Sequence, residues 1–184
     1  MKIQYVKRYE MVLDLMRTYL GRPTLPESFF WVPWNSALTA THAYVKFVSF
    51  RNELDAVIFP TFTSYESCLR LMGSIASKNG FIPQATWMIA NRLKDQNSIR
   101  YCSTIQGILQ KGKLGAIQNV AVIPDCRKMG LGKALVLKSL FGFKSVGCEE
   151  VSLEVTADNF PAVHLYREIG FKIIRTLYKE TFIP

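Results

Sequence analysis

The alternation of hydrophobic and polar residues predicts strands at both ends of the chain. Residues 3–16 place apolar side chains at alternate positions, with polar ones between them, as in a strand with one buried face. A helix is the competing interpretation of that stretch. Residues 151–156 alternate in the same way, and residues 171–181 form the last predicted strand.

Between the first strand and residue 80, the pattern predicts a loop followed by two helices. The proline-bearing residues 22–34 are typical of a loop, and an apolar stripe predicts a helix over residues 36–52. Thr63 and Glu66 form a capping box, which opens a second helix that Gly80 closes.

The remainder of the chain predicts a sheet with one crossover. Apolar strands over residues 84–90, 99–109 and 114–123 are separated by polar turns, which favours an antiparallel meander. Helices are expected over residues 129–146 and 159–169. The strand, helix and strand between residues 114 and 156 form a right-handed crossover joining two parallel strands. The expected fold class is therefore α+β, or mixed α/β, with a central mixed sheet flanked by helices in one domain, residues 1–184.

Composition supports a globular chain and excludes several other classes. With 184 residues, 49% hydrophobic and 20% charged, the chain can bury a full core, whereas disorder, collagen and coiled coils need other compositions. The longest uncharged run, residues 28–45, is too polar to cross a bilayer. Charges within residues 1–10 interrupt any signal peptide. We therefore expect a cytoplasmic protein without a membrane partner.

Charge and cysteine usage narrow the range of ligands. The net charge of +9 is spread evenly, and such an excess suits nucleic acid and a small polyanionic ligand equally well. A nucleic-acid binder is disfavoured because the chain lacks clustered charge and a recognised module. Four cysteines without a C-x-x-C pair, and only two histidines, predict neither a disulfide framework nor a metal site.

The segment from residue 120 to 135 combines a strand, a basic turn and a glycine-containing helix start. The strand stops at Pro124, and Gly130 and Gly132 fall in the first turn of the helix that follows. Glycines there leave the first N–H groups and the positive end of the helix dipole open to a pyrophosphate. The nearby basic residues are Arg127, Lys128 and Lys133. These features predict an anion site.

Two familiar phosphate loops do not fit this segment. A P-loop needs a glycine where Arg127 stands and a hydroxyl residue where Ala134 stands. A dinucleotide fingerprint starting at Gly130 needs a small residue in place of Leu135. Without a further motif, close helix packing would account for the two glycines.

Further motifs are present, and together they resemble one family. Arg127, Gly130 and Gly132 match the R/Q-x-x-G-x-G/A signature of the GNAT superfamily of acetyl-CoA-dependent N-acyltransferases. Residues 153–171, LEVTADNFPAVHLYREIGF, resemble the second block of the branch that acetylates protein N-terminal amines, ribosomal alanine acetyltransferases included. The resemblance implies an acetyl-CoA-binding core over residues 84–184. It leaves residues 1–83 as a variable, acceptor-side half.

The resemblance also implies which residues contact acetyl-CoA. In the family, the strand before the loop pairs with pantetheine through its backbone, and an N–H of that strand polarises the thioester carbonyl. Asn159 is a helix N-cap on its own pattern, and the resemblance adds a cofactor contact through its amide. The implied contacts come from Val120, Ala121, Val122, Arg127, Lys128, Met129, Gly130, Leu131, Gly132, Lys133, Asn159 and Tyr166.

Two catalytic roles follow from the resemblance. Tyr166 is the implied general acid for the leaving thiolate, with a buried core tyrosine as the alternative. Glu154 is the implied base for the acceptor amine, with a solvated sheet residue as the alternative. A covalent mechanism through Cys126 is the rival chemistry, but no histidine lies near it in sequence.

The expected function is therefore acetyl transfer from acetyl-CoA to an amine by direct attack in a ternary complex. The acceptor is a protein N-terminus, a lysine or a small-molecule amine. The alternative is a catalytically weak domain of this family that binds acyl-CoA as a regulatory module. The sequence leaves a homodimer open.

Overall fold

The computed structural model describes residues 2–93 and 98–183, which form one seven-stranded sheet in the order β2-β3-β4-β5-β6-β1-β7. The turn expected around residues 93–98 includes residues outside this described part. The strands are β1 (Lys2–Asp14), β2 (Phe29–Pro33), β3 (Phe81–Arg92), β4 (Ile99–Leu109), β5 (Leu114–Val122), β6 (Glu150–Thr156) and β7 (Lys172–Ile183).

The sheet is mixed, as the sequence predicted. β3, β4 and β5 form the antiparallel meander, and β5 and β6 are the parallel pair joined by a helical crossover. β1 lies between β6 and β7 and pairs antiparallel with both. The first strand of the chain therefore lies between the last two strands, so the two halves of the sequence are interleaved in the sheet.

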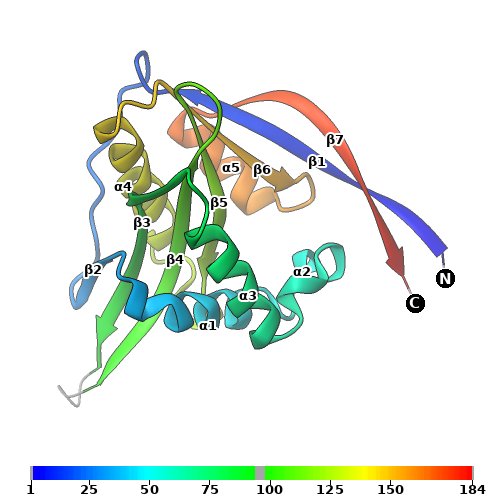
Figure 1. The fold of residues 1–184 in the computed structure, drawn as a ribbon, viewed down its shortest axis with the longest axis horizontal. Coiled ribbons are helices and arrows are strands. Elements are labelled where there is room, and N and C mark those ends of the chain that lie inside the picture. The colour runs from blue at the N-terminus through cyan, green and yellow to red at the C-terminus, as the bar shows by residue number, and fades with distance from the viewer. Residues whose placement is uncertain (1, 94–97, 184) are drawn as a thin grey trace.

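Helices cover both faces of the sheet (Figure 1). The helices are α1 (Thr39–Phe50), α2 (Leu54–Ile58), α3 (Tyr65–Ala76), α4 (Leu131–Ser145) and α5 (Phe160–Ile169). Side chains at alternate positions of β4 separate the two faces: Thr104 contacts His42 of α1, whereas Gly107 faces Phe143 of α4.

Close packing of α4 fixes the crossover against the sheet. A Cβ at Gly142 would lie 1.9 Å from the carbonyl oxygen of Gln84, so only glycine allows this approach of the helix to β3. Phe143 and Leu135 are fully buried in the main core. The position of α4 against the sheet is therefore set by tight packing.

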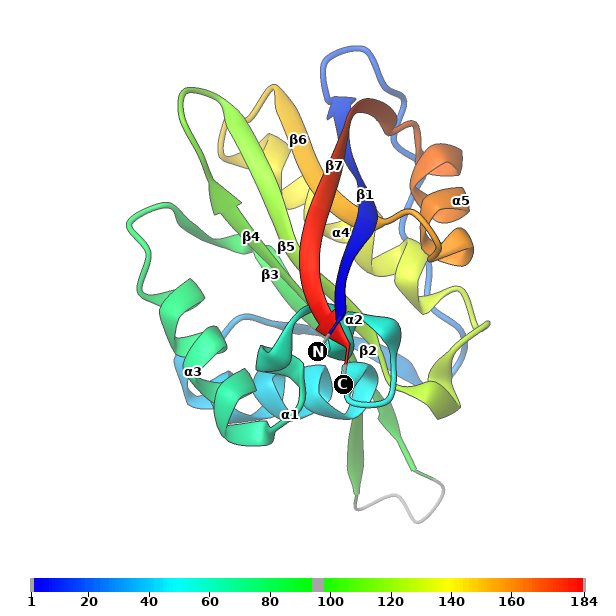
Figure 2. The ribbon, with the colours of Figure 1, turned by 90° about the vertical axis from the view of Figure 1, so that its right-hand side faces the viewer.

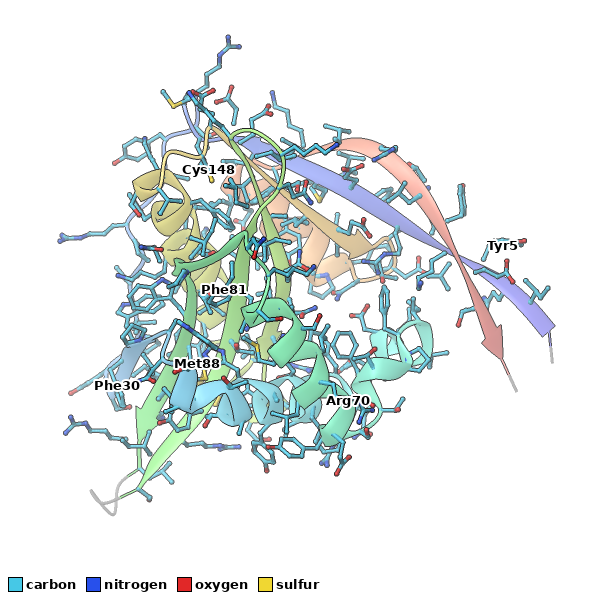
Figure 3. The ribbon with its side chains drawn as sticks, viewed as in Figure 1. Tyr5, Phe30, Arg70, Phe81, Met88 and Cys148 are labelled. Atoms are coloured by element: carbon cyan, nitrogen blue, oxygen red, sulfur yellow. The ribbon has the colours of Figure 1, made fainter. Side chains whose placement is uncertain are left out.

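β1 and β7 continue past the body of the molecule as a long two-stranded arm (Figures 1 and 2). Their register runs from Lys2 opposite Ile183 to Val12 opposite Lys172. Tyr5 lies on the outer part of this arm and is exposed (Figure 3). Near the outer end of the arm, Thr181 Oγ1 donates a hydrogen bond to the carbonyl oxygen of Val57 in α2.

Three local predictions were wrong. Residues 29–33 are not loop but the edge strand β2, because they pair with β3. The helix predicted to open at Thr63 is capped by Ser64, whose hydroxyl accepts from the Ser67 N–H, and it ends at Ala76 rather than Gly80. Gly130 is the N-cap of α4 and lies before its first turn. The strand prediction for residues 3–16 is confirmed by β1, so the competing helix interpretation is excluded.

The short helix α2 was not predicted at all.

None of the helices in the described part is long and apolar enough to span a membrane. The four cysteines are buried and unlinked.

Candidate functional site

β5 and β6 separate soon after they pair, which opens the sheet between them (Figure 2). Their parallel pairing covers only Leu114 to Ala116 on β5 and Glu150 to Ser152 on β6. From Ile117 to Val122, the edge of β5 that faces β6 has no partner strand among the described residues. Unpaired strand edges offer backbone N–H and C=O groups to an extended ligand.

The start of α4 forms a backbone cradle beside this opening. Lys128 and Gly130 both have positive φ angles, 60° and 78°, which turn the chain sharply into the helix. No side chain caps the α4 N-terminus, so its first N–H groups keep their donor capacity. A Cβ at Gly132 would meet Leu165 and Val122 only at ordinary distances of 3.6 and 3.9 Å. The missing side chains therefore leave space in front of the helix dipole.

We call the hollow at this helix start the α4 cleft, which has a volume of about 810 Å³. Its walls include the β5 edge, the loop and first turn of α4 between Cys126 and Lys133, and α5. Of the predicted cofactor-binding residues, only Met129 does not line it; Val120, Ala121, Val122, Arg127, Lys128, Gly130, Leu131, Gly132, Lys133, Asn159 and Tyr166 do.

A second hollow, which we call the β5–β6 pocket, lies on the other side of the strand opening. Its volume is about 400 Å³, and its charged lining residues are Arg8, Glu10, Asp55 and Glu154. The α4 cleft and the β5–β6 pocket meet at residues that line both, namely Phe50, Asp55, Val120, Thr156, Asn159, Ala162 and Tyr166.

Tyr166 lies at this junction. It is 7% exposed, and its ring packs edge-on against Phe171 with 5.9 Å between centroids. Burial, together with the nearby Asp55 carboxylate, raises the pKa of the Tyr166 hydroxyl well above its usual range. The hydroxyl therefore stays protonated at neutral pH and is available as a proton donor.

Glu154 borders the β5–β6 pocket from β6. Its neighbours Leu153 and Val155 are buried in the core, while the Glu154 side chain points to the opposite face and is 54% exposed. Arg8 Nε on β1 lies 3.5 Å from Glu154 Oε2. The Glu154 carboxylate thus lines the pocket, but it is exposed to solvent and forms an ion pair with the Arg8 guanidinium.

Two predicted ligand residues are engaged within the protein. The Asn159 side-chain oxygen accepts the Ala162 N–H at 3.3 Å and so caps α5, as its own pattern indicated. Arg127 reaches away from the helix start: it donates to Glu53 Oε1 at 2.6 Å and to the carbonyl oxygens of Ser49 and Val122. Arg127 therefore joins the loop to the segment after α1.

Asp55 is a site residue that the sequence analysis missed. It sits in the five-residue helix α2, and its carboxylate accepts a hydrogen bond from Thr156 Oγ1 at 3.2 Å, with Arg8 Nη1 at 3.9 Å. Burial raises the pKa of the Asp55 carboxyl above its usual value; the Thr156 hydrogen bond and Arg8 oppose that shift. In the sequence, the only signal for this residue was an acidic side chain at the start of the short apolar run that forms α2.

A buried polar network backs the β5–β6 pocket from α1. Lys46 is fully buried and donates to Asn119 Oδ1 at 3.0 Å, and His42 contacts Thr104 Oγ1 at 2.7 Å. Burial lowers the pKa of Lys46 to about 7 and, with Lys46 beside it, that of His42 to about 3. Since Asn119 lines the pocket, Lys46 holds one of its polar walls in place.

Comparison with known proteins agrees with this geometry. Residues 82–171 match the acetyltransferase (GNAT) family model. An N-alpha-acetyltransferase from Sulfurisphaera tokodaii is 41% identical over 66 residues, 35% of this chain and 40% of that protein. A mycothiol acetyltransferase from Saccharomonospora viridis is 43% identical over 63 residues, 34% of this chain and 21% of that protein. The matches thus span less than half the length of either relative.

The fold is shared with solved structures. A GCN5-related N-acetyltransferase from Sphaerobacter thermophilus superposes with a TM-score of 0.70 over 97% of this chain and 51% of that chain, at 21% identity. The mixed sheet flanked by helices, predicted from the sequence, is confirmed by this likeness. Residues 82–171 thus match the acetyltransferase (GNAT) family, and the chain has the fold of a GCN5-related N-acetyltransferase.

Proposed function

We propose that this chain transfers an acetyl group from acetyl-CoA to an amine while both are bound. The observation that carries the proposal is the meeting of the α4 cleft and the β5–β6 pocket at a buried, protonated tyrosine, Tyr166. Direct transfer needs two binding sites that open onto one point, because the amine must reach the thioester without leaving the protein.

The α4 cleft fits acetyl-CoA in its chemistry. The uncapped first turn of α4, with Gly130 and Gly132 free of side chains, would hold the pyrophosphate through backbone N–H groups. Lys128 and Lys133 line the cleft and add positive charge. The unpaired β5 edge at Val120 and Val122 would hold the pantetheine arm through its backbone. When bound, acetyl-CoA supplies an activated acetyl group on a thiol that leaves readily.

The protein contributes positioning, polarisation and a proton. A backbone N–H of the β5 edge would polarise the acetyl carbonyl, and Tyr166 would donate its proton to the departing sulfur. The direct route needs no nucleophilic side chain, so Cys126, which is buried in the core, is assigned no covalent role.

The β5–β6 pocket would receive the acceptor. Most of its charged side chains come from outside the segment that matches the family: Arg8 and Glu10 from β1, and Asp55 from α2. We therefore keep the division into an acetyl-CoA-binding part within residues 84–184 and an acceptor-side part within residues 1–83. Glu154, the base implied by the resemblance, is one of two carboxylates near the junction.

An amine screen tests the proposal. The chain is incubated with acetyl-CoA and, separately, a tetrapeptide with a free N-terminus, Nα-acetyl-lysine amide, glucosamine and spermidine. We expect thiol release together with one added acetyl group on at least one amine, measured by mass spectrometry. Tight acetyl-CoA binding in calorimetry without transfer to any of them would contradict the proposal and favour an acyl-CoA-binding module.

A further inference from the structure

Asp55 is the charged residue that lines both the α4 cleft and the β5–β6 pocket near Tyr166. Its side chain is 21% exposed, against 54% for Glu154. Phe50 and Phe59, on either side of α2, line the β5–β6 pocket with it, so an apolar wall surrounds the carboxylate. A carboxylate in this position is close to the point where the amine and the acetyl group would meet.

The charges around the β5–β6 pocket leave one carboxylate without a cation of its own. Glu10 is paired with Arg175, with contacts of 2.5 and 2.7 Å. Arg8, the one cation among the described lining residues, lies 3.5 Å from Glu154 and 3.9 Å from Asp55. Three carboxylates thus face two guanidiniums, and the excess negative charge matches one ammonium group.

The hydrogen bonds indicate where that ammonium would bind. Arg8 Nη1 donates to Thr156 Oγ1 at 2.9 Å, and Thr156 Oγ1 donates in turn to Asp55 Oδ1 at 3.2 Å. These two hydrogen bonds orient the Asp55 carboxylate, although no cation forms a short ion pair with it. The Asp55 carboxylate keeps lone pairs for a further donor.

We infer that Asp55 binds the ammonium group of the acceptor and removes its proton, and that Glu154 serves instead to hold Arg8. This inference rests on the proposed function and names a residue and a substrate class for it, a protonated primary amine. Asp55 is then a catalytic residue, whereas Glu154 is a positioning residue that acts through Arg8 and Thr156.

The environment of Asp55 suits a proton acceptor. Burial raises the pKa of its carboxyl toward that of an ammonium, and a smaller difference between the two pKa values makes proton transfer easier. The groups that face it are Arg8 from β1, Glu53 beside it, and Tyr166 from α5. Arg8 opposes the shift and Glu53 adds to it.

The proton balance of the reaction closes with these groups. Asp55 takes one proton from the ammonium, and the neutral nitrogen then forms its bond to the acetyl carbon as the carbon–sulfur bond breaks. Tyr166 gives its proton to the sulfur and regains one from the acylated nitrogen. Asp55 releases its proton to solvent, so the products are an amide, CoA with a free thiol, and one proton.

Two substitutions test the assignment, each measured with the amine that the wild type acetylates fastest in the screen above. Asp55→Asn should lower kcat/KM near pH 7 by about 10²-fold, a common loss for a general base, while acetyl-CoA affinity is unchanged. Part of the loss should return near pH 10, where the amine is already neutral. Glu154→Gln should cost less, and Glu149→Gln, at a residue that lines neither hollow, should match the wild type.

Chemical rescue and stability distinguish catalysis from a structural role. Formate added to Asp55→Ala should restore part of the rate, and formate should not restore Glu154→Ala. Because burial raises the pKa of the Asp55 carboxyl, folding disfavours its charged form, so Asp55→Asn should melt no lower than the wild type. An active wild type with an equally active Asp55→Asn variant would overturn the inference alone. A wild type that binds acetyl-CoA but acetylates no amine would overturn the proposed function and the inference together.

Discussion

The proposed donor side and the proposed acceptor side of the site are built in different ways. At the α4 cleft, the working groups are backbone N–H groups and the spaces left by glycines, all within the continuous segment from Val120 to Lys133. At the β5–β6 pocket, the working groups are side chains brought together from separate elements, such as Arg8 from β1, Asp55 from α2 and Glu154 from β6. A backbone site therefore has a local sequence signature, and a side-chain site assembled by the fold has none.

The largest expected effect is on the donor side alone. Gly132→Glu places a negative side chain in the pyrophosphate position, so we expect acetyl-CoA binding to weaken by more than about 10²-fold, or 2.7 kcal/mol. The fold should survive, because a Cβ at Gly132 makes only ordinary contacts and an acidic residue suits a helix start. Calorimetry and a melting curve measure the two effects.

Gly73→Glu is the matched control for that substitution. Gly73 is exposed on α3, and a Cβ there has no described atom within 4 Å. The same change of charge should therefore leave acetyl-CoA affinity as it is. Equal affinities for Gly132→Glu and wild type would show that the α4 cleft is not the donor side.

A smaller effect is expected at the junction of the two sides. Tyr166→Phe removes the proton donor but keeps the ring packed on Phe171, so kcat should fall by about 10²-fold with little change in acetyl-CoA affinity. Tyr178→Phe, on the exposed face of β7, is the control. A Tyr166→Phe enzyme as fast as wild type would remove the tyrosine from the reaction.

On the acceptor side, Lys46 links pH to stability. Its pKa is lowered to about 7 in the folded chain from 10.5, so the unfolded chain binds more protons between these values and stability rises with pH there. The slope is at most about 1.4 kcal/mol per pH unit. Lys46→Met should lack this rise, so its stability advantage should shrink from pH 7 to pH 10 in denaturant titrations. A constant difference between the two proteins would contradict the lowered pKa of Lys46.

The smallest effect concerns the ion pair between Arg127 and Glu53, which both line the α4 cleft. Arg127 and Glu53 are each about 40% exposed, and exposed ion pairs contribute little, typically below about 1 kcal/mol. Arg127→Gln should weaken acetyl-CoA binding by less than about tenfold, and Glu53→Gln should tighten it slightly by removing a carboxylate from the cleft. The double variant reports their coupling. A loss as large as that of Gly132→Glu would make Arg127 a direct phosphate ligand.

The sequence predicted the sheet meander, the crossover and the glycine-containing helix start, because each depends on a local pattern of alternation or spacing. It missed β2, whose strand conformation depends on pairing with β3. It missed α2, which has five residues and no periodic stripe, and with it Asp55. The role of Glu154 also could not be read from alternation, since the pattern places the carboxylate on a face but does not reveal Arg8 beside it.

Amide hydrogen exchange with and without acetyl-CoA tests the central claim most directly. We predict slower exchange for the amides of residues 130–133 at the α4 start and of Val120 and Val122 along the β5 edge, because these groups gain ligand acceptors. The β1 amides of residues 3–7, which are paired with β7 in the arm, should exchange unchanged. Tight binding of acetyl-CoA that leaves the amides of residues 130–133 unprotected would contradict the account.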